Sequence, residues 1–366
     1  MTRVAPRPSA QRRDRIAVAL LTGYLGSGKT TLLNAVVRQP AWADTAVIVN
    51  ELGEIGIDHL LIEQATDNVV LLDSGCLCCA LQGGLRETLA DLFVRRVNGT
   101  VPPFRRVVVE TTGLADPGPI ANALVADALL REEFVLASIV TTIDGLAGAR
   151  IIDSEWEATR QVALADVLVI TKGDLADGPS LGALDQQLAT INPLAPRLRA
   201  VKGDLPVQTL FPDSYSPAAL HLRSSRFAEQ AGPVAASILN RGKLMPTQST
   251  HLRGIRSFVF TLPAASSWAG IAAWTNLVAA HFGDQLLRTK GLIEVAEIGR
   301  PVAVHGIGRY FHPPEPLAAW PSDDHRSRLV CIGRNLDAAA LQASLRAFTL
   351  AAGAERPSSL AELLTL

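Results

Sequence analysis

The residues best suited to chemistry form a glycine-rich loop near the N-terminal end of the chain. The segment GYLGSGKT at 23–30 matches the pattern G-x-x-x-x-G-K-[ST], and it directly follows a short apolar run. In such a loop successive backbone N–H groups point inward around phosphates, the lysine neutralises charge and the hydroxyl ligates Mg²⁺. We therefore predict a nucleotide-binding phosphate loop. Its predicted binding residues are Gly23, Gly26, Ser27, Gly28, Lys29, Thr30 and Thr31.

A second segment, Glu110-Thr111-Thr112-Gly113, follows the apolar run RVVV. Phosphate-loop proteins place an acidic residue near Mg²⁺ at this point of the chain, and a glycine whose N–H meets the γ-phosphate. The acid here is a glutamate instead of the commoner aspartate. The predicted catalytic residues are accordingly Lys29, Thr30, Glu110 and Gly113, with Thr30 and Glu110 as the Mg²⁺ site.

A third segment, Thr171-Lys172-Gly173-Asp174, ends the apolar run VLVIT and matches the guanine-binding pattern N-K-x-D except at its first position. The Asp174 carboxylate can accept hydrogen bonds from guanine N1–H and the 2-amino group, which adenine does not supply. The stem of Lys172 can cover the base and ribose. A solvated strand end would explain the tetrapeptide alone, but its position after a phosphate loop favours guanine. The predicted nucleotide is GTP, bound through Lys172 and Asp174.

Three of the four cysteines lie together at Cys76, Cys78 and Cys79, just before a helix-like segment that begins near residue 83. Thiolates at a helix entrance are stabilised by the helix dipole, and three of them can converge on one metal ion. We predict a transition-metal site for Zn²⁺, with Co²⁺, Fe²⁺ and Cu(I) as alternatives and a fourth ligand still required. Buried or redox-inert cysteines remain the alternative interpretation. The isolated Cys331, inside the apolar run LVCIG, is expected in a core.

The acidic loop NELGE at 50–54 occupies the place of a first switch segment. Glu51 and Glu54 could serve Mg²⁺-bound water or the transition metal, and Glu54 is the candidate fourth ligand. A solvated acidic turn is the alternative, and His59 is isolated in the sequence. The cysteines fall between NELGE and ETTG, the two segments that should sense the γ-phosphate. This order predicts a metal site coupled to nucleotide state.

Charge and hydropathy exclude several functional classes. The 366 residues carry a formal net charge of −1, without the basic surface that nucleic-acid binding requires. No apolar run approaches the length of a membrane span, and the apolar run after the basic N-terminal residues is too short for a signal peptide. We therefore expect a cytoplasmic protein without nucleic-acid or membrane partners.

The positions of apolar runs predict an α/β fold for the first part of the chain. Short β-rich runs alternate with helix-like segments, which is typical of a doubly wound parallel sheet with helices on both faces. After a disordered arm at 1–13, the phosphate-loop domain is predicted to span 14–205. The expected strands are 16–21, 46–50, 69–72, 106–110, 135–143 and 167–171, and the expected helices lie near 29–38, 83–96, 117–130, 155–165 and 181–191.

The second part of the chain predicts a smaller α+β domain. Residues 206–250 are rich in proline and glycine and are expected to form a linker with one short helix. From 251 to 366, strands are expected at 255–262, 291–298, 301–310 and 328–333, with helices at 266–283 and 336–349. Consecutive strands flanked by helices indicate an antiparallel sheet covered on one face. Trp268, Ile271, Trp274 and Val278 share one face of the first helix and are expected in the core.

Together these segments resemble the CobW/YjiA-type P-loop GTPases. GYLGSGKTTLLN, NELGEIGID, SGCLCC, ETTGLADPGPI and TKGDL occur in the order of that family, and LLRTKG, VHGIGRYF and RLVCIGR extend the resemblance into the second domain. The resemblance implies a slow GTPase that delivers or handles a metal, with zinc, cobalt for cobalamin and nitrile hydratase activation among the assigned roles. It places the phosphates on 26–31 and the transition metal on the three clustered cysteines. The histidine-rich stretch of many zinc- and cobalt-handling members is missing here.

Three functions follow from these observations. The first is a GTP-hydrolysing metallochaperone or metalloenzyme activator, which acts on a client metalloprotein of unknown identity. The second is a regulatory GTPase with structural cysteines, and the third is a metal-binding module with a relic nucleotide site. Intact Lys29, Thr30, Glu110 and Asp174 argue against the third. Within the first, an activator specific for cobalt or iron stays open beside one for zinc.

Overall fold

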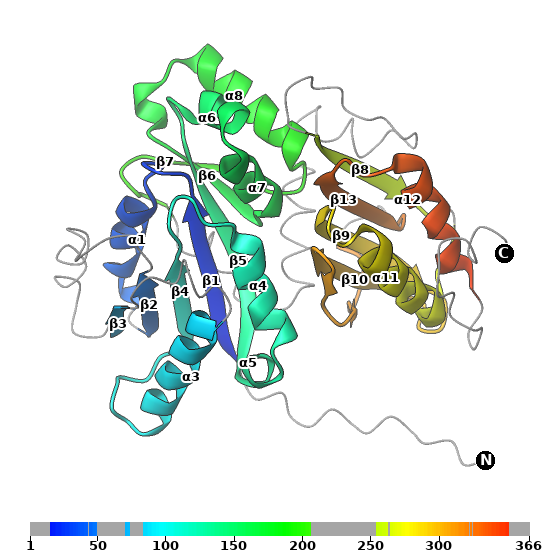
Figure 1. The fold of residues 1–366 in the computed structure, drawn as a ribbon, viewed down its shortest axis with the longest axis horizontal. Helices are drawn as coiled ribbons and strands as arrows, with labels where there is room; N and C mark the ends of the chain where they lie inside the picture. The colour runs from blue at the N-terminus through cyan, green and yellow to red at the C-terminus, as the bar shows by residue number, and fades with distance from the viewer. Residues whose placement is uncertain are drawn as a thin grey trace.

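The structure is a computed structural model that describes residues 15–42, 44–49, 70–73, 83–205, 254–262, 264–321, 323 and 325–350. Its first sheet is parallel throughout and has the strand order β3-β2-β4-β1-β5-β6-β7 (Figure 1). The predicted parallel α/β fold is confirmed. The strands are β1 (Ile16–Gly23), β2 (Thr45–Val49), β3 (Val70–Asp73), β4 (Arg106–Glu110), β5 (Phe134–Asp144), β6 (Val167–Thr171) and β7 (Arg197–Ala200).

Helices cover both faces of the parallel sheet. On one face Leu32, Leu33 and Val36 of α1 pack against β1 and β4, whereas α3, α4, α7 and α8 share a separate buried cluster on the other face. Both faces of the strands are therefore buried, which explains why the strand sequences are apolar along their length. The helices are α1 (Lys29–Val37), α3 (Gly83–Val97), α4 (Pro117–Ala126), α5 (Ala128–Glu133), α6 (Gly148–Ser154), α7 (Trp156–Leu164) and α8 (Gly178–Ile191), with 3-10 turns at Pro40–Trp42 and Gly173–Leu175.

The prediction of a single helix near 117–130 is wrong, because the helix is interrupted at Asp127. Asp127 has extended backbone angles and caps α5, its carboxylate accepting hydrogen bonds from the N–H groups of Leu129 and Leu130. An aspartate that bonds nearby N–H groups favours a new helix start over continuation of the old one. The strand β7 and the short helix α6 were not predicted. β7 has the sequence RLRA and, among the described strands, pairs with β6 alone, so it lacks the apolar pattern of an inner strand.

The second sheet is antiparallel and has the order β11-β10-β9-β13-β8, with β12 paired to β10. Trp274, Ile271 and Val278 of its long helix are buried against this sheet, and Cys331 is fully buried, as expected. Trp268 is partly buried against the same cluster. The elements are β8 (Ile255–Thr261), α11 (Trp268–Phe282), β9 (Leu286–Val295), β10 (Arg300–Ile307), β11 (Tyr310–Phe311), β12 (Glu315–Pro316), β13 (Arg328–Arg334), α12 (Ala338–Ser344) and a 3-10 turn at Leu345–Thr349.

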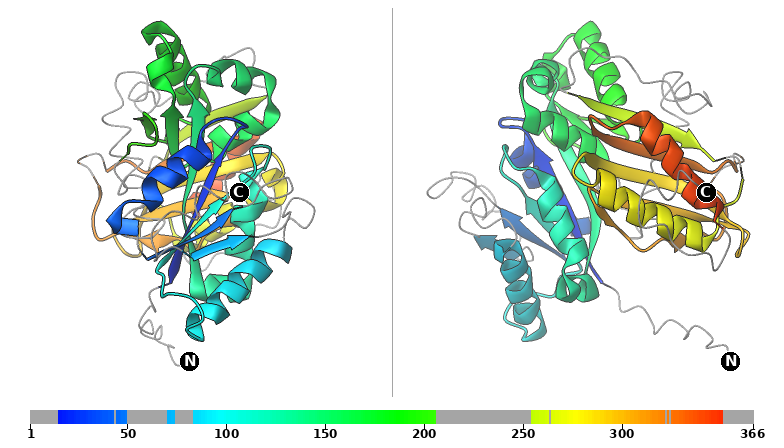
Figure 2. Two further views of the ribbon diagram at one scale, coloured as in Figure 1. Left: turned by 90° about the vertical axis from the view of Figure 1, so that its left-hand side faces the viewer. Right: turned by 45° about the vertical axis from the view of Figure 1, so that its right-hand side comes forward.

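The antiparallel sheet is covered on both faces, not on one face as expected. Its own helices α11 and α12 lie on one side, and the helices of the parallel sheet lie on the other (Figures 1 and 2). Ile307, Val330 and Ile332 belong to the same buried cluster as α7 and α8. The two sheets therefore share a continuous apolar core. The predicted linker at 206–250 lies outside the described residues.

A buried ion cluster also joins the two sheets. Asp166, between α7 and β6, pairs with Arg288 and Lys290 of β9, and its Oδ1 lies 2.7 Å from Lys290 Nζ. All three side chains are almost completely buried. Burial raises the pKa of the Asp166 carboxyl, but the two cations outweigh this effect and hold that pKa at about 2. Asp166 is therefore charged at neutral pH.

None of the helices within the described residues is long and apolar enough to cross a membrane.

Candidate nucleotide site

The predicted phosphate loop lies between β1 and α1, at the carboxyl edge of the parallel sheet (Figure 1). Three of its glycines have positive φ angles, 143° at Gly23, 72° at Gly26 and 90° at Gly28. Residues with a Cβ rarely adopt these angles, so the glycines are needed for the turn. At Gly23 a Cβ would also come within 2.3 Å of Thr142 Oγ1. The sequence thus forms the curved backbone that a phosphate group requires.

Hydroxyl groups from two neighbouring strands hold the loop in place. Ser27 Oγ lies 2.7 Å from Thr142 Oγ1 of β5, and Thr171 Oγ1 of β6 donates to Ser27 O at 2.7 Å. Thr171 stands where the guanine-binding pattern has asparagine, a residue expected mainly to brace loops. Its buried hydroxyl supplies such a brace to the phosphate loop.

Lys29 begins α1 and turns its ammonium group back over the loop. Its Nζ donates to Gly23 O at 3.0 Å and to Tyr24 O at 3.3 Å, and the residue is only 8% exposed. The positive charge is therefore held beside the inward-facing backbone of the loop. This is the position from which a lysine can neutralise phosphate charge.

Thr30 and Glu110 meet, although 80 residues separate them in the sequence. Thr30 Oγ1 donates to Glu110 Oε1 at 2.8 Å, and Glu110 is 1% exposed at the end of β4. The pairing of β4 with β1 brings Glu110 opposite Leu21, just before the loop. A hydroxyl and a carboxylate are both hard oxygen ligands of the kind Mg²⁺ prefers, so this donor set fits the ion.

Gly113 lies directly against the phosphate loop. A Cβ at this position would come within 2.6 Å of the backbone nitrogen of Leu25, so only glycine fits. Behind it, Gln161 Nε2 of α7 donates to Gly113 O at 3.1 Å and to Ala115 O at 3.0 Å. Gln161 was not predicted from the sequence. The sequence feature that could have pointed to Gln161 is its polar side chain beside Ala158 and Val162 on the buried face of α7.

Lys172 and Asp174 lie at the carboxyl end of β6, on the same edge of the sheet as the phosphate loop. Lys172 has a positive φ of 53°, and its Nζ donates to Gly26 O and to Asp144 Oδ2, both at 2.7 Å. Its side chain therefore reaches across to the phosphate loop. Asp174 is exposed beside it. Asp144 was not predicted from the sequence; burial raises the pKa of its carboxyl, but the hydrogen bond from Lys172 and two backbone N–H groups lower it overall.

The predicted metal residues Cys76, Cys78, Cys79 and Glu54 lie outside the described residues, as do Glu51 and His59. The flanking strands are described. β2 and β3 are parallel neighbours that end together, with Val49 opposite Asp73, and β4 places Glu110 on the other side of Val49. β2, β3 and β4 therefore all end at the carboxyl edge of the sheet. In the ranges that the structure describes, no three His, Cys, Asp or Glu side chains could hold a metal ion together.

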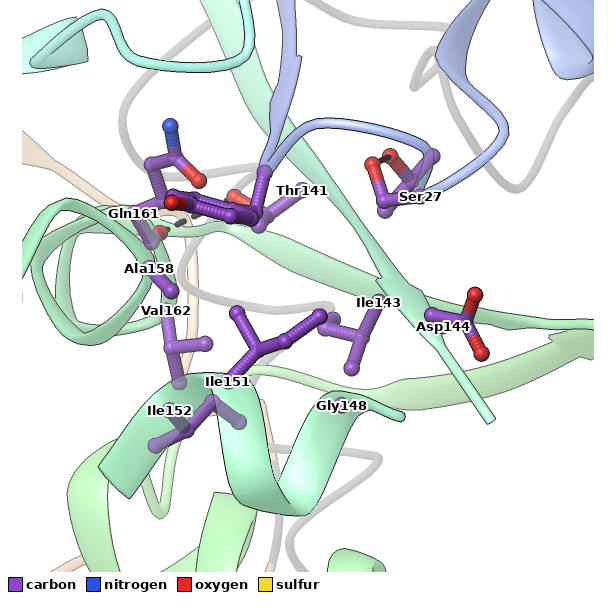
Figure 3. Close-up of a pocket in the computed structure, with 12 residues that line it drawn as sticks. Ser27, Thr141, Ile143, Asp144, Gly148, Ile151, Ile152, Ala158, Gln161 and Val162 are labelled. Atoms are coloured by element: carbon purple, nitrogen blue, oxygen red, sulfur yellow. Dashed lines mark hydrogen bonds between the residues drawn. The ribbon is translucent and has the colours of Figure 1, made fainter. Parts of the chain in front are cut away.

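A small cavity of about 20 Å³ lies behind the phosphate loop (Figure 3). Ile143, Ile151 and Val162 form its apolar part, and Ser27 and Gln161 line it as well. A cavity of this size holds about one water molecule. A nucleotide therefore does not fit in this cavity.

Two family descriptions match the chain over consecutive regions. The CobW/HypB/UreG nucleotide-binding domain matches residues 17–199, and the Cobalamin synthesis protein cobW C-terminal domain matches residues 255–349. The first match covers the parallel sheet and its helices, and the second covers the antiparallel sheet with α11 and α12.

Individual relatives agree with these matches. The zinc chaperone YjiA of Escherichia coli is 36% identical over 196 residues, which are 54% of this chain and 61% of that protein. The zinc chaperone CobW of Pseudomonas aeruginosa is 28% identical over an alignment of 391 positions, with 93% of this chain and 96% of the relative covered. The crystal structure of Zn(II)-bound YjiA GTPase has the same fold, with a TM-score of 0.65 at 24% identity over 91% of this chain and 99% of that one. The geometry of the phosphate loop and the two successive domain matches lead to one conclusion: the chain belongs to the CobW family.

Proposed function

We propose that this chain is a GTP-hydrolysing metallochaperone or metalloenzyme activator, which binds a transition metal at Cys76, Cys78 and Cys79. One observation carries the nucleotide part, namely the hydrogen bond between Thr30 and the buried Glu110 beside the loop that holds Lys29. The metal part is supported by the donor chemistry of clustered thiolates, which suits Zn²⁺ first and Co²⁺ or Fe²⁺ as alternatives. The relatives in Escherichia coli and Pseudomonas aeruginosa are both named zinc chaperones.

In this proposal the phosphates bind to backbone N–H groups from Gly26 to Thr31 and to the Lys29 ammonium. Thr30 would hold Mg²⁺ directly, with Glu110 as the acidic partner. When bound, Mg²⁺ neutralises charge on the phosphate oxygens. The amide of Gly113, which lies against the loop, would meet the γ-phosphate. Nucleotide hydrolysis then depends on fixed donors that surround the charge developing on the transferred phosphoryl group.

We assign guanine recognition to Asp174, with Lys172 bridging the base and the phosphate loop. The contact of Lys172 Nζ with Gly26 O supports this assignment, because the alkyl stem must cross the space beside the loop to reach that carbonyl. Asp144 keeps the lysine in this orientation through its ion pair.

Asp174→Asn is expected to weaken GTP binding by about ten- to a hundredfold, because a carboxylate that accepts two guanine N–H groups becomes an amide that also presents a donor. Competition titration of GTP against ATP measures the change. Asp177→Asn is the matched control. Asp177 lies three residues after Asp174 and caps α8 by accepting a hydrogen bond from the N–H of Ser180, and an asparagine caps a helix equally well. Wild-type protein that binds ATP and GTP equally would show that guanine recognition is wrong.

We expect metal and nucleotide to alter each other's affinity by the same factor, as thermodynamic linkage requires. For adjoining sites the factor should be about 5–150. The measurement is a Zn²⁺ titration against a competing chelator, with protein saturated by GDP or by a non-hydrolysable GTP analogue at fixed Mg²⁺. Repeating it with Co²⁺ and Fe²⁺ ranks the three metals.

The control for the metal titration uses the fourth cysteine. Burial raises the pKa of the Cys331 thiol to about 12, so this thiol stays protonated and is a poor metal ligand. Cys331→Ala should keep the metal, whereas a variant with serine at Cys76, Cys78 and Cys79 should lose it. Equal metal affinity with GDP and the GTP analogue would favour the alternative, a regulatory GTPase with structural cysteines.

The client would be a metalloprotein that receives the ion, and we place the exchange in the cytoplasm. Reduced thiolates are needed for metal binding, and the cytoplasm keeps cysteines reduced.

A further inference from the structure

Gln161 is a fully buried carboxamide on an otherwise apolar helix face. Its neighbours Ala158 and Val162 pack in the core, and Gln161 itself is 0% exposed. A buried amide costs folding free energy unless its hydrogen-bonding groups find partners. Its two N–H groups have partners, and both partners belong to one segment of backbone. The segment is the stretch after β4 that carries Gly113.

The two hydrogen bonds fix that segment from behind. Gln161 Nε2 donates to the carbonyls of Gly113 and Ala115 at 3.1 and 3.0 Å. From the front, Gly113 meets the backbone of Leu25 in the phosphate loop, with no room for even a Cβ. The amide of Gly113 thus lies between the phosphate loop and α7, and a shift of the carboxamide would move it.

The helix that carries Gln161 is itself firmly held. The backbone carbonyl of Gln161 accepts a hydrogen bond from Thr141 Oγ1 of β5 at 2.9 Å. At the end of α7, Asn192 Nδ2 donates to the carbonyls of Val162 and Ala165, both at 2.9 Å. α7 is therefore a rigid support from which Gln161 positions a loop segment.

A second side chain of α7 contacts the same segment after β4. Arg160 Nη2 lies 2.7 Å from Asp116 Oδ2, and Asp116 follows Ala115 and caps α4. This ion pair is about 30% exposed on each side, so it contributes little stability. Its place in the chain shows that α7 contacts three successive parts of the segment: Gly113, Ala115 and Asp116.

We propose that Gln161 is a positioning residue for the GTPase reaction, which holds the Gly113 amide at the distance from the phosphate loop that a γ-phosphate requires. This inference rests on the proposed function, because it assumes that Gly113 meets the γ-phosphate. The proposal predicts different effects on the binding of GTP and of GDP, because GDP has no γ-phosphate and does not need the Gly113 amide. Loss of the carboxamide donors should therefore weaken binding of the triphosphate and slow catalysis, and leave GDP binding unchanged.

The test compares Gln161→Met, which keeps the length and unbranched shape of the side chain but has no donor, with wild-type protein. We expect affinity for a non-hydrolysable GTP analogue and kcat each to fall about tenfold, while GDP affinity stays within about twofold. Trp274→Phe is the control. It removes a buried side-chain N–H donor outside this support, because Trp274 Nε1 donates to Ser344 Oγ at 3.0 Å in the core beside the antiparallel sheet. That control should lower the Tm and leave the ratio of the two affinities unchanged.

Each outcome decides one question. Wild-type protein that neither hydrolyses GTP nor distinguishes the analogue from GDP contradicts the proposed function. Suppose that wild-type protein hydrolyses GTP and distinguishes the analogue from GDP. A Gln161→Met variant with a lower Tm but an unchanged ratio of analogue affinity to GDP affinity then shows that Gln161 only packs the core. If Gln161→Met does not fold, Gln161→Leu provides a second buried side chain without hydrogen-bond donors. If neither variant folds, the side-chain amide resonance of Gln161 in wild-type protein should differ between the GDP and analogue complexes, and an unchanged resonance would overturn the proposal.

Discussion

Lys29→Ala should reduce GTP hydrolysis by at least about two orders of magnitude, which is the typical loss when one fixed donor to a developing negative charge is removed. The ammonium lies beside the loop carbonyls of Gly23 and Tyr24 and supplies the positive charge nearest to the predicted phosphate position. The backbone of the loop depends on glycines with positive φ and on the Ser27 contacts, so the fold should survive. Single-turnover phosphate release measures the rate, and circular dichroism measures the Tm.

The matched control is Arg38→Ala, which removes a positive charge from the exposed C-cap of the same helix, α1. Its turnover should equal that of wild-type protein. An unchanged rate in the Lys29→Ala variant, with normal folding, would mean that the active site lies elsewhere.

Asp166→Asn should lower the free energy of unfolding by about 3–5 kcal/mol, the usual effect of breaking a buried ion pair from one side. The carboxylate is shared by Arg288 and Lys290, both almost fully buried in β9. An asparagine leaves those cations without this counter-charge in a region that water does not reach. The same carboxylate accepts from the N–H of Ile139 in β5 at 2.9 Å, so the substitution also disturbs the parallel sheet. Urea denaturation measures the loss.

Asp185→Asn is the control for this loss, because Asp185 pairs with Arg197 but is 41% exposed. An exposed pair contributes about 0–1 kcal/mol, so this variant should stay close to wild-type stability. The pH dependence gives a second check. The folded pKa of Asp166 is about 2, below its unfolded value near 4, so its contribution is complete above roughly pH 4 and is lost as pH falls towards 2. The stability difference between wild type and Asp166→Asn should shrink in that window, and a constant difference would contradict the assignment.

The phosphate loop could be predicted from the sequence because local chemistry determines it. Gly23, Gly26 and Gly28 are required by backbone angles that other residues rarely adopt, and Lys29 and Thr30 follow at fixed spacing. The inner strands were predictable for a similar reason, since strands covered on both faces must be apolar along their whole length. In both cases the information lies within a few consecutive residues.

The contacts that support the site could not be predicted, because they join residues far apart in the chain. Gln161 lies 48 residues from Gly113, and nothing in the sequence around α7 names its acceptors. Asp166 has the same difficulty: its partners Arg288 and Lys290 are in a different sheet, and the sequence LLRTKG gives no sign that these cations are buried. The edge strand β7 was missed because a strand with one paired side tolerates charged residues.

The shared core between the two sheets has a consequence for how the chain is made. Domains generally fold as units during synthesis, with the N-terminal one first. Here the flank of α7 and α8 packs against β8, β9 and the side chains of Ile307, Val330 and Ile332, all of which are synthesised after β7. A nascent chain that has just completed β7 therefore presents an apolar surface and the Asp166 carboxylate to the cell. The second sheet covers this surface only after it has been synthesised.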